Sequence, residues 1–113
     1  MQIHIQSLGF ELSEAIREHA LRRLRFALAH AADRIRRVTV RVSDINGPRG
    51  GADKCCHILI TMEKLPEIAV EDIESDLYVA IDRAADRAAR TVTRRIDRSL
   101  EHRAASAAPP AAE

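Results

Sequence analysis

The sequence contains few aromatic residues: among 113 residues there are one tyrosine, two phenylalanines and no tryptophan. Aliphatic side chains must therefore fill the core. No apolar run approaches the roughly 20 residues that cross a bilayer. The opening segment, MQIHIQSLGF, lacks the basic start and apolar block of a secretory signal. We therefore expect one cytoplasmic domain with a modest aliphatic core.

Cysteine and glycine are also scarce, and this argues against metal and nucleotide sites. Cys55 and Cys56 are adjacent and have no CxxC spacing, so we expect reduced thiols. Three of the four glycines fall in Asn46–Lys54, but no phosphate-binding motif opens a helix there. The five histidines are scattered, and no HExxH or GxSxG motif is present. The sequence predicts a protein that is not an enzyme and that uses no cofactor or metal.

The cations are almost all arginine, sixteen against two lysines, although the net charge is only +1. Arginine suits planar, bidentate partners such as phosphate and carboxylate. The charges are also segregated. Residues 63–76 hold six acids and one lysine, whereas an acid-free run after Asp33 holds Arg34, Arg36, Arg37 and Arg41. We therefore expect an acidic side and a basic side, as in proteins that present one surface to a polyanion.

Hydrophobic periodicity predicts the order β-α-β-β-β-α. Alternating residues predict strands at Gln2–Ser7, Arg37–Asp44, Cys56–Met62 and Glu67–Glu71. Helical spacing predicts helices from Ser13 to about Ala32 and from Glu74 to about Arg103. The first two strands should be parallel because a helix connects them.

This order predicts an α+β fold in which both helices cover one face of a four-stranded mixed sheet. The other face would be comparatively bare. It would carry Arg37, Thr39, Arg41, His57 and Thr61. We expect a domain over residues 1–103 and a disordered, alanine- and proline-rich tail over residues 104–113.

The last helix carries two separate rows of side chains. Its apolar row consists of Leu77, Ile81, Ala84, Ala85, Ala88, Val92, Ile96 and Ser99. A second row, which we call the arginine ladder, consists of Arg83, Arg87, Arg90, Arg94 and Arg98. At about 100° per residue the ladder falls within roughly 80°, opposite the apolar row. Flanking acids, namely Asp82, Asp86, Asp97 and Glu101, are spaced for pairing along the helix. The ladder is therefore either a polyanion-binding surface or a solvated, internally paired face.

Further cations lie on the first helix and in the glycine-rich loop. The polar side of the first helix carries Arg22, Arg23 and Arg25. Phe26 lies beside them and either stacks on a base or packs against a neighbouring loop. The loop Asn46–Lys54 is predicted to be a mobile basic hairpin loop in which Arg49 and Lys54 are candidate contacts.

The segment SDLYVAIDRAADRAARTVTRRIDR resembles the ribosome hibernation promoting factor family, whose members are also called protein Y, ribosome-associated inhibitor or ribosomal subunit interface protein. Its residues 76–82, DLYVAID, are similar to the family's DMYAAID signature. The opening MQIHI and the following FELSEAIREHA resemble the family's MQxxI and VEITEALRE. The resemblance covers roughly residues 1–100.

The resemblance implies a fold similar to a double-stranded-RNA-binding domain. It also implies a non-catalytic factor that binds the decoding channel of the small ribosomal subunit and inhibits translation under stress. Family positions for rRNA-contacting cations are occupied here by Arg23, Arg87, Arg90, Arg94 and Arg98, whereas Arg83 is an addition. Phe26 departs from a family lysine, the NGPRGG loop is longer, and the dimerisation domain of long members is absent.

Two alternatives stay open at this point. The same arginines would also suit a general double-stranded-RNA binder. They would equally suit a protein-interaction module that pairs with an acidic partner.

Overall fold

The structure, a computed structural model, describes residues 1–45 and 53–107, with side chains up to residue 101. Its elements are β1 (Gln2–Leu8), α1 (Glu14–Ala27), the 3-10 helix η1 (Ala29–Arg34), β2 (Ile35–Asp44), β3 (Lys54–Met62), β4 (Ile68–Glu74) and α2 (Leu77–Ala107). The predicted α+β class and strand–helix order are confirmed. No helix in the described ranges is long and apolar enough to cross a membrane.

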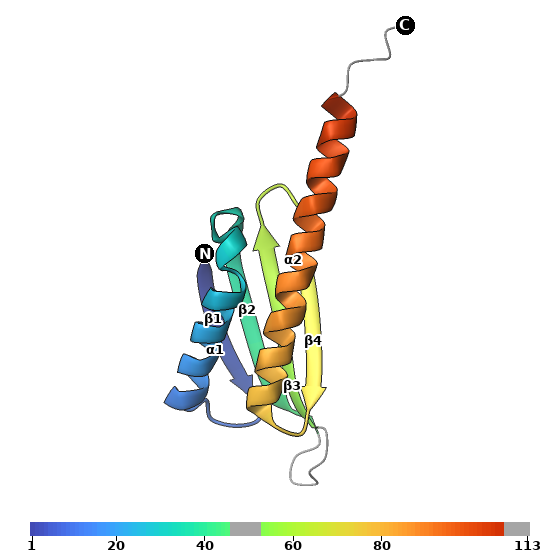
Figure 1. Cartoon of the computed structure of the whole chain (residues 1–113). Helices are drawn as coiled ribbons and strands as arrows, with labels where there is room; N and C mark the ends of the chain where they lie inside the picture. The colour runs from blue at the N-terminus through green and yellow to red at the C-terminus, as the bar shows by residue number, and fades with distance from the viewer. Residues whose placement is uncertain (46–52, 108–113) are drawn as a thin grey trace, which may run out of the picture.

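The four strands form one mixed sheet in the order β1-β2-β3-β4. β1 and β2 are parallel, as predicted, and the two other pairs are antiparallel. Alternate residues of β2, namely Val38, Val40 and Val42, are fully buried, whereas Arg37 and Arg41 are exposed. Figure 1 shows both helices on the same side of the sheet, so the opposite face is left bare.

Helix α2 packs on the sheet through the predicted apolar row. Its fully buried residues are Ala80, Ile81, Ala84, Ala85, Ala88 and Val92. The alanines let the helix backbone lie close to the strands. Ile96 is only partly buried, and Leu100 is exposed. The C-terminal part of α2 therefore projects past the sheet, as Figure 1 shows.

The first helix is shorter than the sequence indicated. Ser13 is its N-cap, as expected, and its hydroxyl accepts a hydrogen bond from the Ile16 amide at 3.2 Å. The α-helix ends at Ala27 rather than near Ala32, and η1 follows. Leu28 and Ala31 are both buried. The three-residue repeat of a 3-10 helix directs both side chains to the core.

The last helix begins and ends later than expected. It starts at Leu77 because the Asp76 carboxylate accepts a hydrogen bond from the Tyr78 amide at 2.8 Å. It continues to Ala107, past the expected domain end at Arg103, since alanine has the highest helix propensity. Residues 46–52 and 108–113 lie outside the described residues, so the predicted loop mobility and tail disorder stay predictions.

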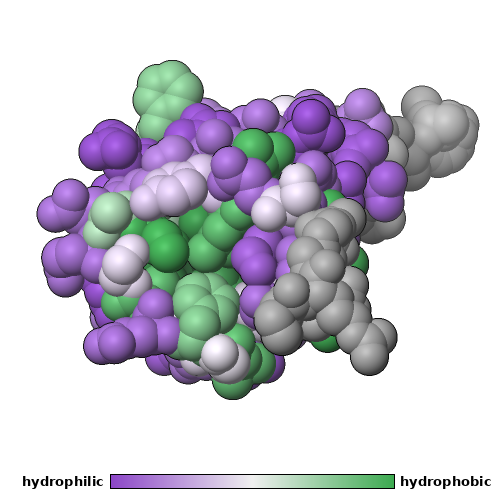
Figure 2. All heavy atoms as spheres, turned by 90° about the horizontal axis from the view of Figure 1, so that it is seen from below, coloured by the Kyte–Doolittle hydropathy of each residue, from purple (hydrophilic) through white to green (hydrophobic). Residues whose placement is uncertain are grey.

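Exposed apolar side chains gather at one end of the molecule. The end of β1 and the residue after β2 expose Leu8 (58%) and Ile45 (54%). Ile73 near the end of β4 and Tyr78 near the start of α2 are also exposed. Strand directions place all four at the same end. Figure 2 shows this end as a hydrophobic patch surrounded by hydrophilic residues.

Candidate nucleic-acid interface

All five residues of the arginine ladder are exposed, as their spacing predicted. Helix α1 lies along one flank of the ladder, where Asp82 and Asp86 of α2 bind Arg23. Strand β4 lies along the other flank. The two flanks give the five guanidinium groups different surroundings.

The first two ladder residues, which we call the paired arginines, bind acids of β4. Arg83 Nη1 lies 3.8 Å from Glu74 Oε2. Arg87 Nη2 lies 3.5 Å from Asp72 Oδ1, and its Nη1 donates to the Glu71 carbonyl at 2.6 Å. A hydrogen bond with the nearly buried Asp72 raises the pKa of Glu74, with burial as a second cause. The Arg87 guanidinium group compensates the charge of the Asp72 carboxylate, which is nearly buried and has little contact with water.

The last three ladder residues, which we call the unpaired arginines, are Arg90, Arg94 and Arg98. Within the described ranges none of them has a hydrogen-bond or ion-pair partner. Of the two alternatives that the spacing left open, these residues do not show the internally paired face within the described ranges. Asp82 and Asp86 turn instead toward α1, where Asp82 meets His19 and both carboxylates bind Arg23.

Among the α1 cations, Arg23 has a structural partner, whereas Arg22 and Arg25 have none among the residues that the structure describes. Arg23 Nε lies 3.0 Å from Asp82 Oδ1, and its Nη2 lies 2.8 Å from Asp86 Oδ1. Burial opposes its charge, but hydrogen bonds to Asp86 and Asp82 outweigh this and raise the pKa of Arg23. Arg22 and Arg25 are exposed. Arg23 thus joins the two helices, whereas Arg22 and Arg25 can meet a ligand.

Phe26 is 79% exposed, so it does not pack against a loop as one of the two readings required. It stays available for stacking beside the α1 cations. The structure describes one of the two candidate loop cations, Lys54, but not the other, Arg49. Lys54 opens β3 rather than lying in the loop, and it binds Asp44 at 2.8 Å and Asp53 at 3.3 Å. Its hydrogen bond to Asp44 raises the pKa of Lys54. Arg49 lies outside the described residues.

Two histidines have partners on α2 that the sequence did not reveal. His19 Nε2 lies 2.7 Å from Asp82 Oδ1, and its ring meets Tyr78 edge-on at 4.9 Å. His30 Nε2 lies 2.9 Å from Thr93 Oγ1. Each polar pair joins residues 63 positions apart. Helical periodicity places Asp82 and Thr93 on one flank of α2, which was the available signal, but it does not say that α1 lies there.

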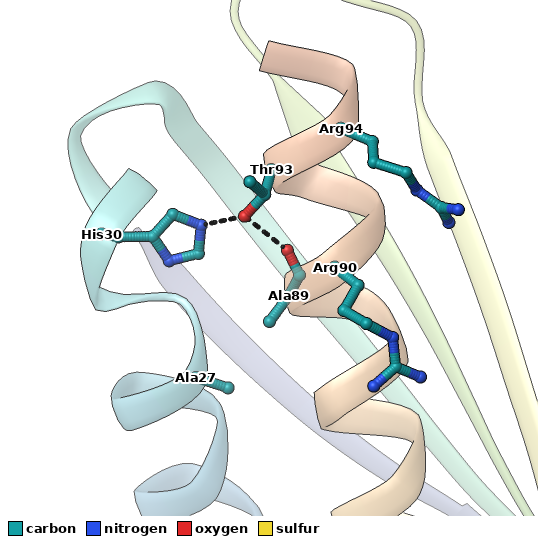
Figure 3. Close-up of a pocket in the computed structure, with 6 residues that line it drawn as sticks. All are labelled: Ala27, His30, Ala89, Arg90, Thr93 and Arg94. Atoms are coloured by element: carbon teal, nitrogen blue, oxygen red, sulfur yellow. Dashed lines mark hydrogen bonds between the residues drawn. The ribbon is translucent and has the colours of Figure 1, made fainter. Parts of the chain in front are cut away.

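A groove of about 460 Å³ separates the end of α1 from α2. It is lined by Ala27, His30, Ala89, Arg90, Thr93 and Arg94. Figure 3 shows His30 and Thr93 meeting across it, while the Arg90 and Arg94 side chains extend away from His30. The two alanines leave an apolar floor, and the exposed Arg90 and Arg94 side chains stand at its rim. The groove can accept a flat group attached to an anion.

A second hollow, of about 480 Å³, lies between the far part of α2 and the β3–β4 turn. Arg98 and Lys64 line it together with Leu65 and Pro66. Arg95 also lines it and donates to the Pro66 carbonyl at 3.3 Å. Arg95 does not belong to the arginine ladder, and it points toward the β3–β4 turn. Its spacing in the sequence therefore did not mark it as a candidate. This hollow adds cations next to the end of the ladder.

The sequence and the fold were compared with those of known proteins. Residues 3–99 match the sequence model of the family described as Sigma 54 modulation protein / S30EA ribosomal protein. The Protein Y N-terminal domain of Thermus thermophilus has 26% identity and a TM-score of 0.68, over 83% of this chain and 98% of that one. A ribosomal subunit interface protein from Coxiella burnetii has 18% identity and a TM-score of 0.69, over 83% and 96%, and shares the fold. No curated protein sequence matches the chain. Since the family match spans most of the sequence, the predicted resemblance is confirmed, and this chain belongs to the Sigma 54 modulation protein / S30EA ribosomal protein family.

Proposed function

We propose that this chain binds the rRNA of the small ribosomal subunit at the decoding and tRNA channel and inhibits translation without catalysing a reaction. The observation that carries the proposal is the row of unpaired arginines on α2. These three cations are exposed and have no partner within the described residues. Because no internal carboxylate neutralises these charges, they are available to bind an external anion. The comparisons support a ribosomal partner. The family description names a ribosomal protein, and the two similar structures are a Protein Y domain and a ribosomal subunit interface protein.

The spacing of the unpaired arginines suits a phosphate backbone. Four residues of helix rise about 6 Å, a spacing close to that between neighbouring phosphates of a nucleic-acid strand. Guanidinium groups form charge-assisted, bidentate hydrogen bonds to phosphate. Affinity would come mainly from these contacts, and the shape of the RNA rather than its base identity would select the site.

The first helix extends the proposed surface. Arg22 and Arg25 would contact phosphates on the α1 side of the groove. Arg23 would act indirectly, because its bonds to Asp82 and Asp86 set the position of α1 against α2. A base that leaves the RNA stack could enter the groove or lie against the exposed Phe26. A protein held in this way would occupy the channel that tRNA and mRNA need, which is the proposed cause of inhibition under stress or in stationary phase.

Sedimentation with purified small subunits tests the proposal. Changing Arg90, Arg94 and Arg98 to Glu should lower small-subunit affinity by at least about 100-fold, because three attractive contacts become repulsive. Replacing the same residues by Lys is the matched control, and it should retain most binding since the charge is kept. Both variants should melt like the wild type, because exposed arginines without partners contribute little to stability. A folded triple-Glu protein that still sediments with the small subunit would refute the proposed surface.

The same variants separate the two alternative functions. A general double-stranded-RNA binder would prefer a plain RNA duplex to the small subunit. A protein-interaction module would keep its partner after the RNA is digested. For the proposed function we expect preference for the small subunit, loss of binding after RNA digestion, and a steep decrease in affinity with salt.

A further inference from the structure

The sheet face opposite the helices carries its own arginines. On β2, Arg37 and Arg41 are exposed and alternate with the buried Val38, Val40 and Val42. Neither arginine has an ion-pair or hydrogen-bond partner in the part of the chain that the structure describes. The helices do not reach them, because both helices lie on the other face (Figure 1). These two cations therefore play no part in the surface proposed above.

Their neighbours provide further hydrogen-bond donors. The strand register places Arg37 between Gln2 of β1 and Thr61 of β3. It places Arg41 between Gln6 and His57. The outward residues of β1 and β2 up to Arg41 form what we call the β1–β2 strip: Gln2, His4, Gln6, Arg37, Thr39 and Arg41. The strip contains no carboxylate, and the acids of this face, Glu67 and Glu71, lie on or beside β4 at the far edge.

One end of the strip forms a hollow of about 210 Å³. Its lining residues are Gln2, Arg36, Arg37 and Thr61. They bring an amide and two guanidinium groups together with a hydroxyl that donates to Glu67 Oε2 at 3.3 Å. Arg36 also lies 3.5 Å from Glu63, but both side chains are mostly exposed and such a pair is weak. The hollow suits one tetrahedral anion. Arg41 lies four residues along β2, about 13 Å away, which is about two phosphate steps of an extended strand.

The composition of the strip favours nucleic acid over protein. Protein interfaces are centred on buried aromatic or aliphatic anchors. The strip has none. Of the large exposed hydrophobics of this face, Leu8 lies at the end of β1, and Ile73 lies on β4 at the far edge of the sheet. Arginine with amide and hydroxyl donors is instead the usual set that contacts phosphate. We propose that the β1–β2 strip binds the phosphate backbone of a second RNA segment, so that one molecule bridges two RNA segments, one on each face.

Four proteins test this inference with a fluorescein-labelled 12-nucleotide single-stranded RNA as the probe. They are the wild type, the helix variant (Arg90, Arg94 and Arg98 to Glu), the strip variant (R37E with R41E) and the combination. Native mass spectrometry should find two RNA molecules on the wild type, one on each single-face variant and none on the combination. In fluorescence anisotropy, the affinity for the second RNA molecule should be at least about tenfold lower for the strip variant than for the wild type. In the helix variant, the salt slope of log K should be about −1.4, since two single-strand phosphates release counterions.

Controls keep each outcome decisive. R37K with R41K keeps the charge and should retain both RNA molecules. A folded strip variant that keeps the wild-type stoichiometry and salt slope would overturn the inference. So would displacement of the RNA from the helix variant by poly-glutamate at equal charge concentration, since the strip would then be a site for acidic protein. The proposed function fails separately, if the helix variant binds small subunits like the wild type.

Discussion

The paired and unpaired arginines occupy one row on one helix, yet their surroundings differ. Arg83 and Arg87 face the acids at the end of β4, whereas farther along α2 the inward residues of β4 are Val70 and Ile68. β4 and α2 run in opposite directions, because α2 begins just after β4 ends (Figure 1). The start of α2 therefore meets the carboxylates of β4, whereas its later turns lie beside the apolar Val70 and Ile68 of that strand. Equal spacing along a helix does not give equal availability for a ligand.

The largest expected effect concerns how much each part of α2 contributes to the stability of the fold. Ile81→Asp would place a charge in the core and should destabilise the protein by more than about 4 kcal/mol. Ile96→Asp, at a partly buried position, should cost only about 1–2 kcal/mol. Urea unfolding measures both. Equal costs for the two variants would mean that the projecting part of α2 is anchored as firmly as the rest.

A second test removes the partner of Asp72. Arg87→Ala would leave a nearly buried carboxylate without its cation and should cost about 1–3 kcal/mol. Adding Asp72→Asn should restore part of that loss, because the amide carries no charge to compensate. The matched control, Arg90→Ala, should change stability by less than about 0.5 kcal/mol. A double-mutant cycle from thermal unfolding gives the coupling, and a coupling near zero would contradict the pairing.

A third test compares binding by single members of the two groups. Arg94→Ala should weaken small-subunit binding about five- to tenfold, because a free cation loses its whole contact. Arg83→Ala should weaken it by only about twofold, since Arg83 must first leave Glu74. Filter binding over a range of salt concentrations measures both. A larger loss of binding for Arg83→Ala than for Arg94→Ala would show that the internal ion pairs do not restrict RNA binding by the paired arginines.

The smallest effect is expected at the chain end. Deleting residues 104–113 removes the last residues of α2, beyond the buried part of the helix that ends at Val92. Unfolding free energy should change by less than about 0.5 kcal/mol. A larger loss would indicate that this segment packs against the domain.

The sequence by itself determined the order of the elements, the apolar row of α2 and the exposed position of the ladder. These features follow from local periodicity, which depends only on neighbours along the chain. It also indicated the family, through the segment around Asp76–Asp82, and the match over residues 3–99 confirmed it. Element ends were less well predicted. The α-helix ended at Ala27 and a 3-10 helix followed, although the helical spacing of apolar residues continued to Leu28 and the buried Ala31.

Only the tertiary structure decided which cations are free. Arg23 and Arg87 look like Arg22 and Arg90 in the sequence, but Asp82 and Asp72 approach them from other elements. Such pairs depend on how α1 and β4 lie against α2, and no local pattern encodes that packing. The partners of His19 and His30 were hidden for the same reason. Periodicity along the chain fixes which side of a helix a residue occupies, whereas the elements packed on that side fix what its charge meets.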